Sequence, residues 1–290
     1  MRTVSLLLVL CLISVTSLFA ATAAEHAAAG RIALARDEQQ KAADLFAKAV
    51  ALEPKNAEYH YLLGAAYGEL AQKSNVLKQA SLAKKTREAF EKAVALDPRH
   101  MPARFGLISY YLIAPGFMGG GEDKAIAQAA AVTKLDALDG HRAYARIYQH
   151  QNKPDLVRKE FVDAVREQPN SARAHYFLGN TYLNEKNWAA AQHEYDTALK
   201  LDPAFMPTYF RLGQLAALAG TNYARGEEML RKYVAYKPTD QEPGLASAWY
   251  WLGQVQEKQG KRAEAKASYT RALGLAPGDK DIVAAIKRVS

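Results

Sequence analysis

The sequence predicts an all-α fold in which pairs of helices repeat along the chain. A proline recurs at nearly constant intervals, as from Pro169 to Pro203, 34 residues later, and on to Pro238 after 35 more. A mostly small residue precedes each of these prolines by five positions, and a bulky residue precedes it by eight. Apolar residues spaced three and four apart fill the segments between, which is the pattern of amphipathic helices. Such a period is typical of helix pairs that stack in series.

Each residue type in the repeat has a physical reason. Proline cannot donate an amide hydrogen and restrains the residue before it, so it ends the second helix of a pair. The bulky residue fills the space between helices, and a glycine in the first helix lets the two backbones approach closely. The aligned prolines are Pro54, Pro98, Pro169, Pro203, Pro238 and Pro277, the bulky residues Phe46, Phe90, Phe161, Tyr195, Leu230 and Tyr269, and the glycines Gly30, Gly64, Gly179, Gly213 and Gly253.

This pattern resembles the tetratricopeptide repeat (TPR) family over nearly everything after residue 23. The resemblance implies a right-handed superhelical α-solenoid of about seven helix pairs, because one pair alone cannot bury its apolar face. We expect units near 24–56, 57–100, 101–137, 138–171, 172–205, 206–245 and 246–280. Residues 281–290 are expected to form a C-terminal capping helix, with Asp281 as its candidate N-cap.

The first 23 residues are typical of a secretory signal peptide. Arg2 precedes an apolar run from Val4 to Ala20, and residues 21–23 form an A-x-A cleavage pattern. We therefore expect export to the periplasm of a Gram-negative cell, or secretion. The alternative is an inner-membrane anchor formed by the uncleaved signal, since the run is borderline for the ~17–25 residues that span a bilayer. Cleavage would also remove Cys11, the only cysteine.

Two units depart from the pattern. The second is about ten residues longer over segment 71–87, which has five basic and no acidic residues. We expect lengthened helices with a lysine-rich edge, either a solvated face or a contact for an acidic partner or membrane headgroups. In the third unit, Pro115 and Gly116 are expected to stop one helix, and Glu122 and Asp123 suit the positive end of the next.

No arrangement typical of catalysis stands out, and we expect no enzymatic activity, no cofactor and no metal. Gly121 is followed by Glu122, which would repel the phosphate that a P-loop binds. The net charge of +8 is a moderate basic excess and does not by itself indicate nucleic-acid binding. Equivalent positions of neighbouring repeats lie ~10 Å apart, too far for joint metal ligation at ~2 Å. This distance excludes a shared metal site for four histidines, which we interpret as packing residues at the fourth position of their units: His26, His60, His141 and His175.

The TPR resemblance also implies a concave groove lined by the first helix of each unit. Its positions five, six and nine carry aromatic rings interleaved with arginines and amides, the residue types that dominate binding energy at interfaces. The expected contact residues are Tyr61, Phe105, Arg142, Arg146, Tyr176, Phe177, Asn180, Phe210, Arg211, Gln214, Tyr250, Trp251 and Gln254. We therefore expect a scaffold that binds a protein or peptide, with possible peripheral association with a membrane or a membrane protein. The alternative is a periplasmic small-molecule or lipid-binding protein associated with a transporter.

Overall fold

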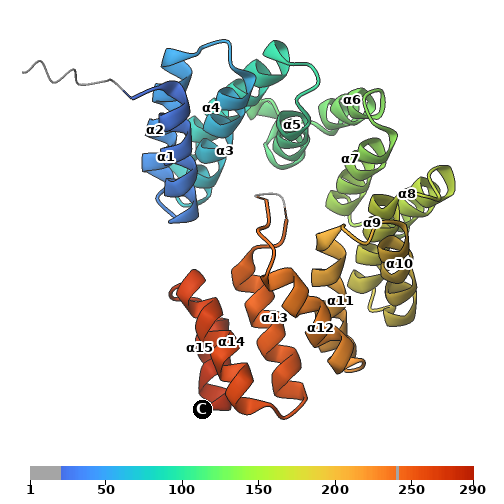
Figure 1. Ribbon diagram of the computed structural model, residues 1–290. Coiled ribbons are helices and arrows are strands. Elements are labelled where there is room, and N and C mark those ends of the chain that lie inside the picture. Colours follow the sequence, from blue (N-terminus) through green and yellow to red (C-terminus); the bar gives the residue numbers. More distant parts are fainter. Residues whose placement is uncertain (1–20, 240–241) are drawn as a thin grey trace, which may run out of the picture. The chain divides into compact units, whose positions relative to one another are not determined.

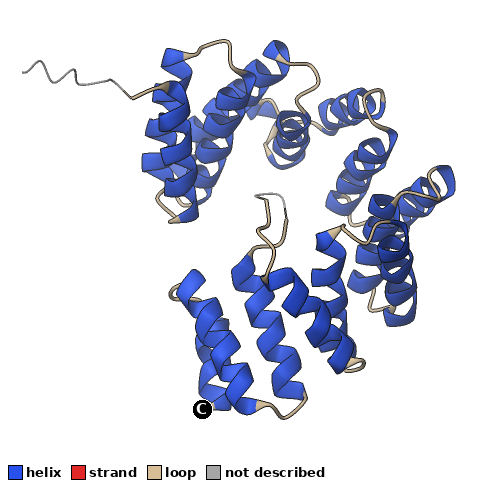
Figure 2. Ribbon diagram, in the orientation of Figure 1, coloured by secondary structure: helices blue, strands red, loops and turns tan. Residues whose placement is uncertain are grey.

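The computed structural model describes residues 21–239 and 242–290, so most of the expected signal peptide lies outside the described residues. Within these ranges the chain consists of 15 α-helices and one short 3-10 helix, with no strand (Figure 2). The prediction of an all-α fold is confirmed. None of the helices in the described part is both long and apolar enough to cross a membrane.

The helices alternate between first and second members of successive pairs (Figure 1). The first helices are α1 (Ala23–Ala35), α3 (Ala57–Gln72), α5 (Met101–Ile113), α7 (Ala137–His150), α9 (Ala172–Asn184), α11 (Met206–Ala219) and α13 (Leu245–Lys258). The second helices are α2 (Gln39–Leu52), α4 (Val76–Leu96), α6 (Glu122–Thr133), α8 (Pro154–Glu167), α10 (Trp188–Leu201), α12 (Tyr223–Val234) and α14 (Arg262–Leu275). A final helix, α15 (Lys280–Val289), packs on α14.

The chain divides into two compact units, and the division falls within α5. We call residues up to Leu107 the N-terminal unit and residues 108–290 the C-terminal unit. In the N-terminal unit α1 packs on α2 and α3 on α4; in the C-terminal unit the same pairing joins α7 to α8, α9 to α10, α11 to α12 and α13 to α14.

Five of the helix pairs are closed by the glycine of the first helix and the bulky residue of the second. A Cβ atom built on Gly179 would lie 2.6 Å from Cε1 of Tyr195, which is completely buried. The ring therefore occupies the space that any other residue at position 179 would need. The same contact joins Gly30 to Phe46, Gly64 to Phe90, Gly213 to Leu230 and Gly253 to Tyr269.

A hydrogen bond to the loop between repeats recurs at the fourth position of the first helix. The donor side chain reaches the carbonyl of the proline six residues earlier, so a histidine here must carry the hydrogen on the nitrogen that faces the oxygen. These bonds join His60 to Pro54 (2.9 Å), Arg104 to Pro98 (2.8 Å), His175 to Pro169 (3.0 Å) and Tyr209 to Pro203 (2.8 Å). The interpretation of these histidines as packing residues therefore missed their hydrogen-bonding role.

The two irregular repeats behave as their sequences predict. Helices α3 and α4 are lengthened to 16 and 21 residues, and the first turn of α4 exposes Val76 and Leu77. In the third repeat α5 ends at Ile113, a 3-10 turn follows at Gly116–Met118, and α6 begins at Glu122. A Cβ atom on Gly120 would lie 1.7 Å from the Ala114 carbonyl oxygen, so this connection requires glycine.

The last helix begins one residue earlier than expected, and its cap is a different aspartate. The side chain of Asp279 accepts hydrogen bonds from the backbone amides of Asp281 (2.9 Å) and Ile282 (3.1 Å). Asp281, predicted as the N-cap, instead lies in the first turn, where its charge faces the positive end of the helix.

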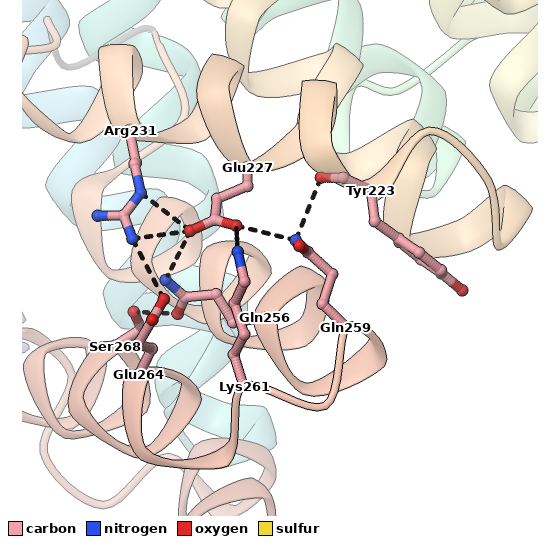
Figure 3. A network of polar contacts seen from close by, with 8 residues as sticks. All are labelled: Tyr223, Glu227, Arg231, Gln256, Gln259, Lys261, Glu264 and Ser268. Atoms are coloured by element: carbon pink, nitrogen blue, oxygen red, sulfur yellow. Dashed lines mark hydrogen bonds and ion pairs between the residues drawn. The ribbon is translucent and has the colours of Figure 1, made fainter.

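A buried polar network joins α12, α13 and α14 (Figure 3). Its centre is Glu227, which is only 6% exposed. The carboxylate accepts hydrogen bonds from Arg231 (2.7 Å), Lys261 (2.7 Å) and Gln259 (2.9 Å). Burial alone would raise the pKa of Glu227, but these donors lower it to about 2. The network thus links the sixth helix pair to the seventh through one ionised carboxylate.

Gly179→Ala should lower the free energy of unfolding by about 1–3 kcal/mol, because the new methyl group overlaps the Tyr195 ring. Urea denaturation followed by circular dichroism measures this change. Gly274→Ala is the matched control: nothing lies within 4 Å of its added Cβ, so the reduced chain entropy should stabilise the protein by up to about 1 kcal/mol. Equal effects of the two substitutions would contradict the packing role of Gly179.

Glu227→Gln should lower the free energy of unfolding at pH 7 by about 2 kcal/mol, the range for hydrogen bonds to a charged group. The pKa of Glu227 is lower in the folded state, to about 2 from an ordinary 4.5, so its stabilisation is present above pH 4.5. That stabilisation is lost as the pH falls from about 4.5 towards about 2. The denaturation curves of the two proteins should therefore differ at pH 7 and approach each other as the pH falls to ~3 and below. Glu228→Gln, on the exposed side of α12, should behave like wild type.

Candidate interaction surface

The first helices of the C-terminal unit carry an excess of arginine. Helices α7, α9 and α11 contain four arginines and one aspartate, and no other lysine, arginine, aspartate or glutamate. We call Arg142, Arg146, Arg173 and Arg211 the arginine row. Helix α11 contacts both α9 and α13, so these first helices lie next to one another in series.

Two members of the arginine row share one carboxylate and one aromatic ring. Asp139, which is buried, forms ion pairs with Arg142 on its own helix and with Arg173 on α9, the latter at 3.0 Å. The guanidinium carbons of Arg142 and Arg173 also lie 4.7 and 6.0 Å from the centre of the Phe177 ring. Asp139 therefore orients two guanidinium groups over one ring, an arrangement that cation–π attraction favours.

Arg146 lies one turn beyond Arg142 on α7. Its Nη1 atom donates a hydrogen bond of 2.7 Å to the hydroxyl of Ser109. Removal from water, the larger effect, and the positive charge of Arg142 both lower the pKa of Arg146. The two guanidinium groups are thus close enough to repel each other.

Arg211 is half-buried on α11 and lies 5.6 Å from the centre of the Phe210 ring. Its Nη1 atom donates to the side-chain oxygen of Gln214 at 2.7 Å. Its Nε atom is buried without an acceptor, and no carboxylate in residues 21–239 or 242–290 forms an ion pair with it. Burial raises the pKa of Tyr195 and Tyr233, and the charge of Arg211 partly opposes both shifts.

Two of the predicted contact rings pack into the protein. Tyr176 is 8% exposed and Phe210 is 3% exposed. The ring of Tyr176 lies edge-on to Phe205, with ring centres 5.2 Å apart, and Phe210 packs on Tyr233 at 5.5 Å. These two rings therefore support the surface and contribute little exposed area to it.

The half-buried polar residues nearby are better placed for contact. Asn180 accepts a hydrogen bond from the Tyr195 hydroxyl (2.8 Å), and its amide nitrogen has no acceptor among the described residues. On α13, Gln254 donates to the Tyr250 hydroxyl at 3.0 Å, and the rings of Tyr250 and Trp251 meet edge-on at 5.6 Å. Each of these side chains retains surface that a ligand can reach.

The remaining predicted residues, Tyr61 and Phe105, belong to the N-terminal unit. Tyr61 stacks on Phe90, with ring centres 5.9 Å apart, and lies 5.2 Å from the His100 ring. Sequence reasoning did not single out Arg173 or Asp139, although both occupy the second position of their repeats, which the TPR resemblance assigns to the groove.

A separate recess of about 310 Å³ lies between α6, α7 and α8. It is lined by Tyr144, Tyr148 and His141, whose ring nitrogens face Glu160 (2.7 Å) and Glu167 (3.2 Å). Burial opposes protonation of His141, but these two carboxylates outweigh it and raise its pKa. The carboxylates are therefore already paired. Within the described residues no group of three or more metal-ligating side chains is placed to hold a metal ion.

Comparison with protein-family models identifies two repeats in the chain. The tetratricopeptide repeat model matches residues 172–205 and 246–279. No curated protein sequence matches the chain.

Several solved structures share the fold at low sequence identity. A tetratricopeptide repeat protein from Parabacteroides merdae is 13% identical, with a TM-score of 0.52, over 92% of this chain and 98% of that one. The Cut9–Hcn1 hetero-tetramer of the APC/C matches at 16% identity and TM-score 0.54, over 92% of this chain and 48% of that chain. The human IFIT1 dimer with m7Gppp-AAAA matches at 18% identity and TM-score 0.57, over 93% and 63%.

This chain thus spans about half of the matched Cut9–Hcn1 chain and under two thirds of IFIT1. At these identities the likeness establishes the fold alone. The two matched segments are tetratricopeptide repeats, and the solved structures share the fold of serially packed helix pairs.

Proposed function

We propose that the chain is a non-catalytic scaffold, exported to the periplasm, that binds a protein or peptide segment along the first helices of its C-terminal unit. The observation that carries this proposal is the arginine row together with the aromatic and amide side chains beside it. Arginine, tyrosine and tryptophan supply much of the binding energy at protein interfaces, because they combine large contact areas with specific hydrogen bonds.

The amides beside the row suit an extended peptide. The nitrogen of Asn180 is available to donate, and the amide of Gln214 lies next to Arg211. Side-chain amides both donate and accept, so they can pair with the backbone of a peptide whatever its sequence. Repeats stacked in series supply the elongated surface that such a ligand needs.

Trp251→Ala and Phe177→Ala should each weaken recovery of the partner by roughly tenfold, the effect expected for an aromatic side chain at the centre of an interface. A quantitative pull-down from periplasmic extract, with the bound protein identified by mass spectrometry, measures this. Trp188→Ala is the matched control, since Trp188 is a partly buried ring at the start of a second helix, α10. Undiminished recovery by both first-helix variants would refute the proposed surface.

Export predicts a defined start of the mature chain. Cleavage after the A-x-A pattern would leave Ala24 as the first residue. It would also remove Thr22, which forms a capping box with Glu25 at the start of α1 and stabilises that end by about 1 kcal/mol. N-terminal sequencing of the protein from its native host tests this. A chain that still begins at Met1 would contradict cleavage and support the membrane-anchored alternative.

A further inference from the structure

The charges of the C-terminal unit are distributed unequally between first and second helices. Helices α8, α10 and α12 carry eight acidic and seven basic residues, and many of these pair three or four positions apart on one helix. Helices α7, α9 and α11 carry four arginines against a single aspartate. Positive charge is therefore concentrated on the surface proposed for binding.

The arginines of this surface are held close together, in orientations that suit binding of an anion. Arg142 and Arg173 are held over Phe177 by Asp139, and Arg146 has a second guanidinium beside it. A planar guanidinium fixed against an aromatic ring loses little further freedom when it binds a carboxylate through two parallel hydrogen bonds.

Arg211 is the arginine of this surface whose contacts indicate an anionic ligand most clearly. Of its three nitrogens only Nη1 is hydrogen-bonded within the described part of the chain, and that bond goes to a neutral amide. A buried donor without an acceptor destabilises the folded chain. A carboxylate from outside the chain would supply the counter-charge that Arg211 lacks.

We propose that the partner segment is an acidic peptide whose carboxylates bind Arg211 and the cluster of Arg142, Arg146 and Arg173. This inference rests on the proposed function and specifies the chemistry of the ligand. A peptide fits better than a nucleic acid, because the side-chain amides of Asn180 and Gln214 adjoin the arginine row and can pair with a peptide backbone.

The test uses the full chain and three short fluorescent peptides built on the repeats Glu-Gly-Tyr, Gln-Gly-Tyr and Lys-Gly-Tyr. Fluorescence anisotropy should show binding of the glutamate peptide at least about tenfold tighter than the glutamine peptide, and little binding of the lysine peptide. The preference should shrink between about 50 and about 200 mM salt, since it is electrostatic.

Substitutions of single arginines test which residue is responsible for the preference for the glutamate peptide. Arg211→Gln should weaken binding of the glutamate peptide by about tenfold and leave the glutamine peptide unchanged, and Arg211→Lys should restore part of the loss because it keeps the charge. Arg225→Gln, which removes an exposed arginine paired with Asp196 on the second helices, is the matched control and should bind like wild type.

The outcomes separate this inference from the proposed function. Equal binding of the glutamate and glutamine peptides would overturn the acidic ligand and leave peptide binding intact. Binding of none of the three peptides would count against both. Displacement of the glutamate peptide by single-stranded RNA, or by vesicles containing anionic lipid, at lower concentrations than unlabelled peptide would assign the arginine row to phosphate and overturn the proposal.

Discussion

The structure depends on one contact, the insertion of a bulky side chain into the gap left by a glycine on the partner helix. Because Gly179 has no side chain, the Tyr195 ring lies directly against the backbone of α9. This contact sets both the separation and the rotation of the two helices. Rotation matters most for function, since fixing which face of a first helix is buried also fixes which residues remain on its outer face.

The same contact tolerates variation in the size of the residues that meet. Leu230 replaces the ring opposite Gly213, and in the fourth repeat Ala145 replaces the glycine while Phe161 remains only half-buried. Protein cores accept many hydrophobic exchanges of this kind. The register of the first helices is therefore preserved from α7 to α13, which allows arginines on different repeats to form one row.

Features governed by local sequence could be predicted, and features governed by contacts between residues far apart in the sequence could not. The helix pairs and the long α4 follow from periodicity and proline positions. The burial of Tyr176 and Phe210 depends on Phe205, the residue before α11, and on Tyr233 of α12, which reach them only in the folded chain. The pairing of Arg173 with Asp139, 34 residues away, likewise cannot be predicted from the local sequence pattern.

The separation of charge between helices follows from a conflict between stability and binding. Arginines in excess of carboxylates on a binding surface repel one another and destabilise the folded chain. Glu227 shows how the second helices offset this: its carboxylate is satisfied by Arg231 and Lys261 and joins two repeats. On α7, α9 and α11 a single aspartate pairs with two of four arginines, so an excess of positive charge remains on these first helices for a ligand to neutralise. The second helices therefore both support the binding surface and offset the destabilising positive charge of the first helices.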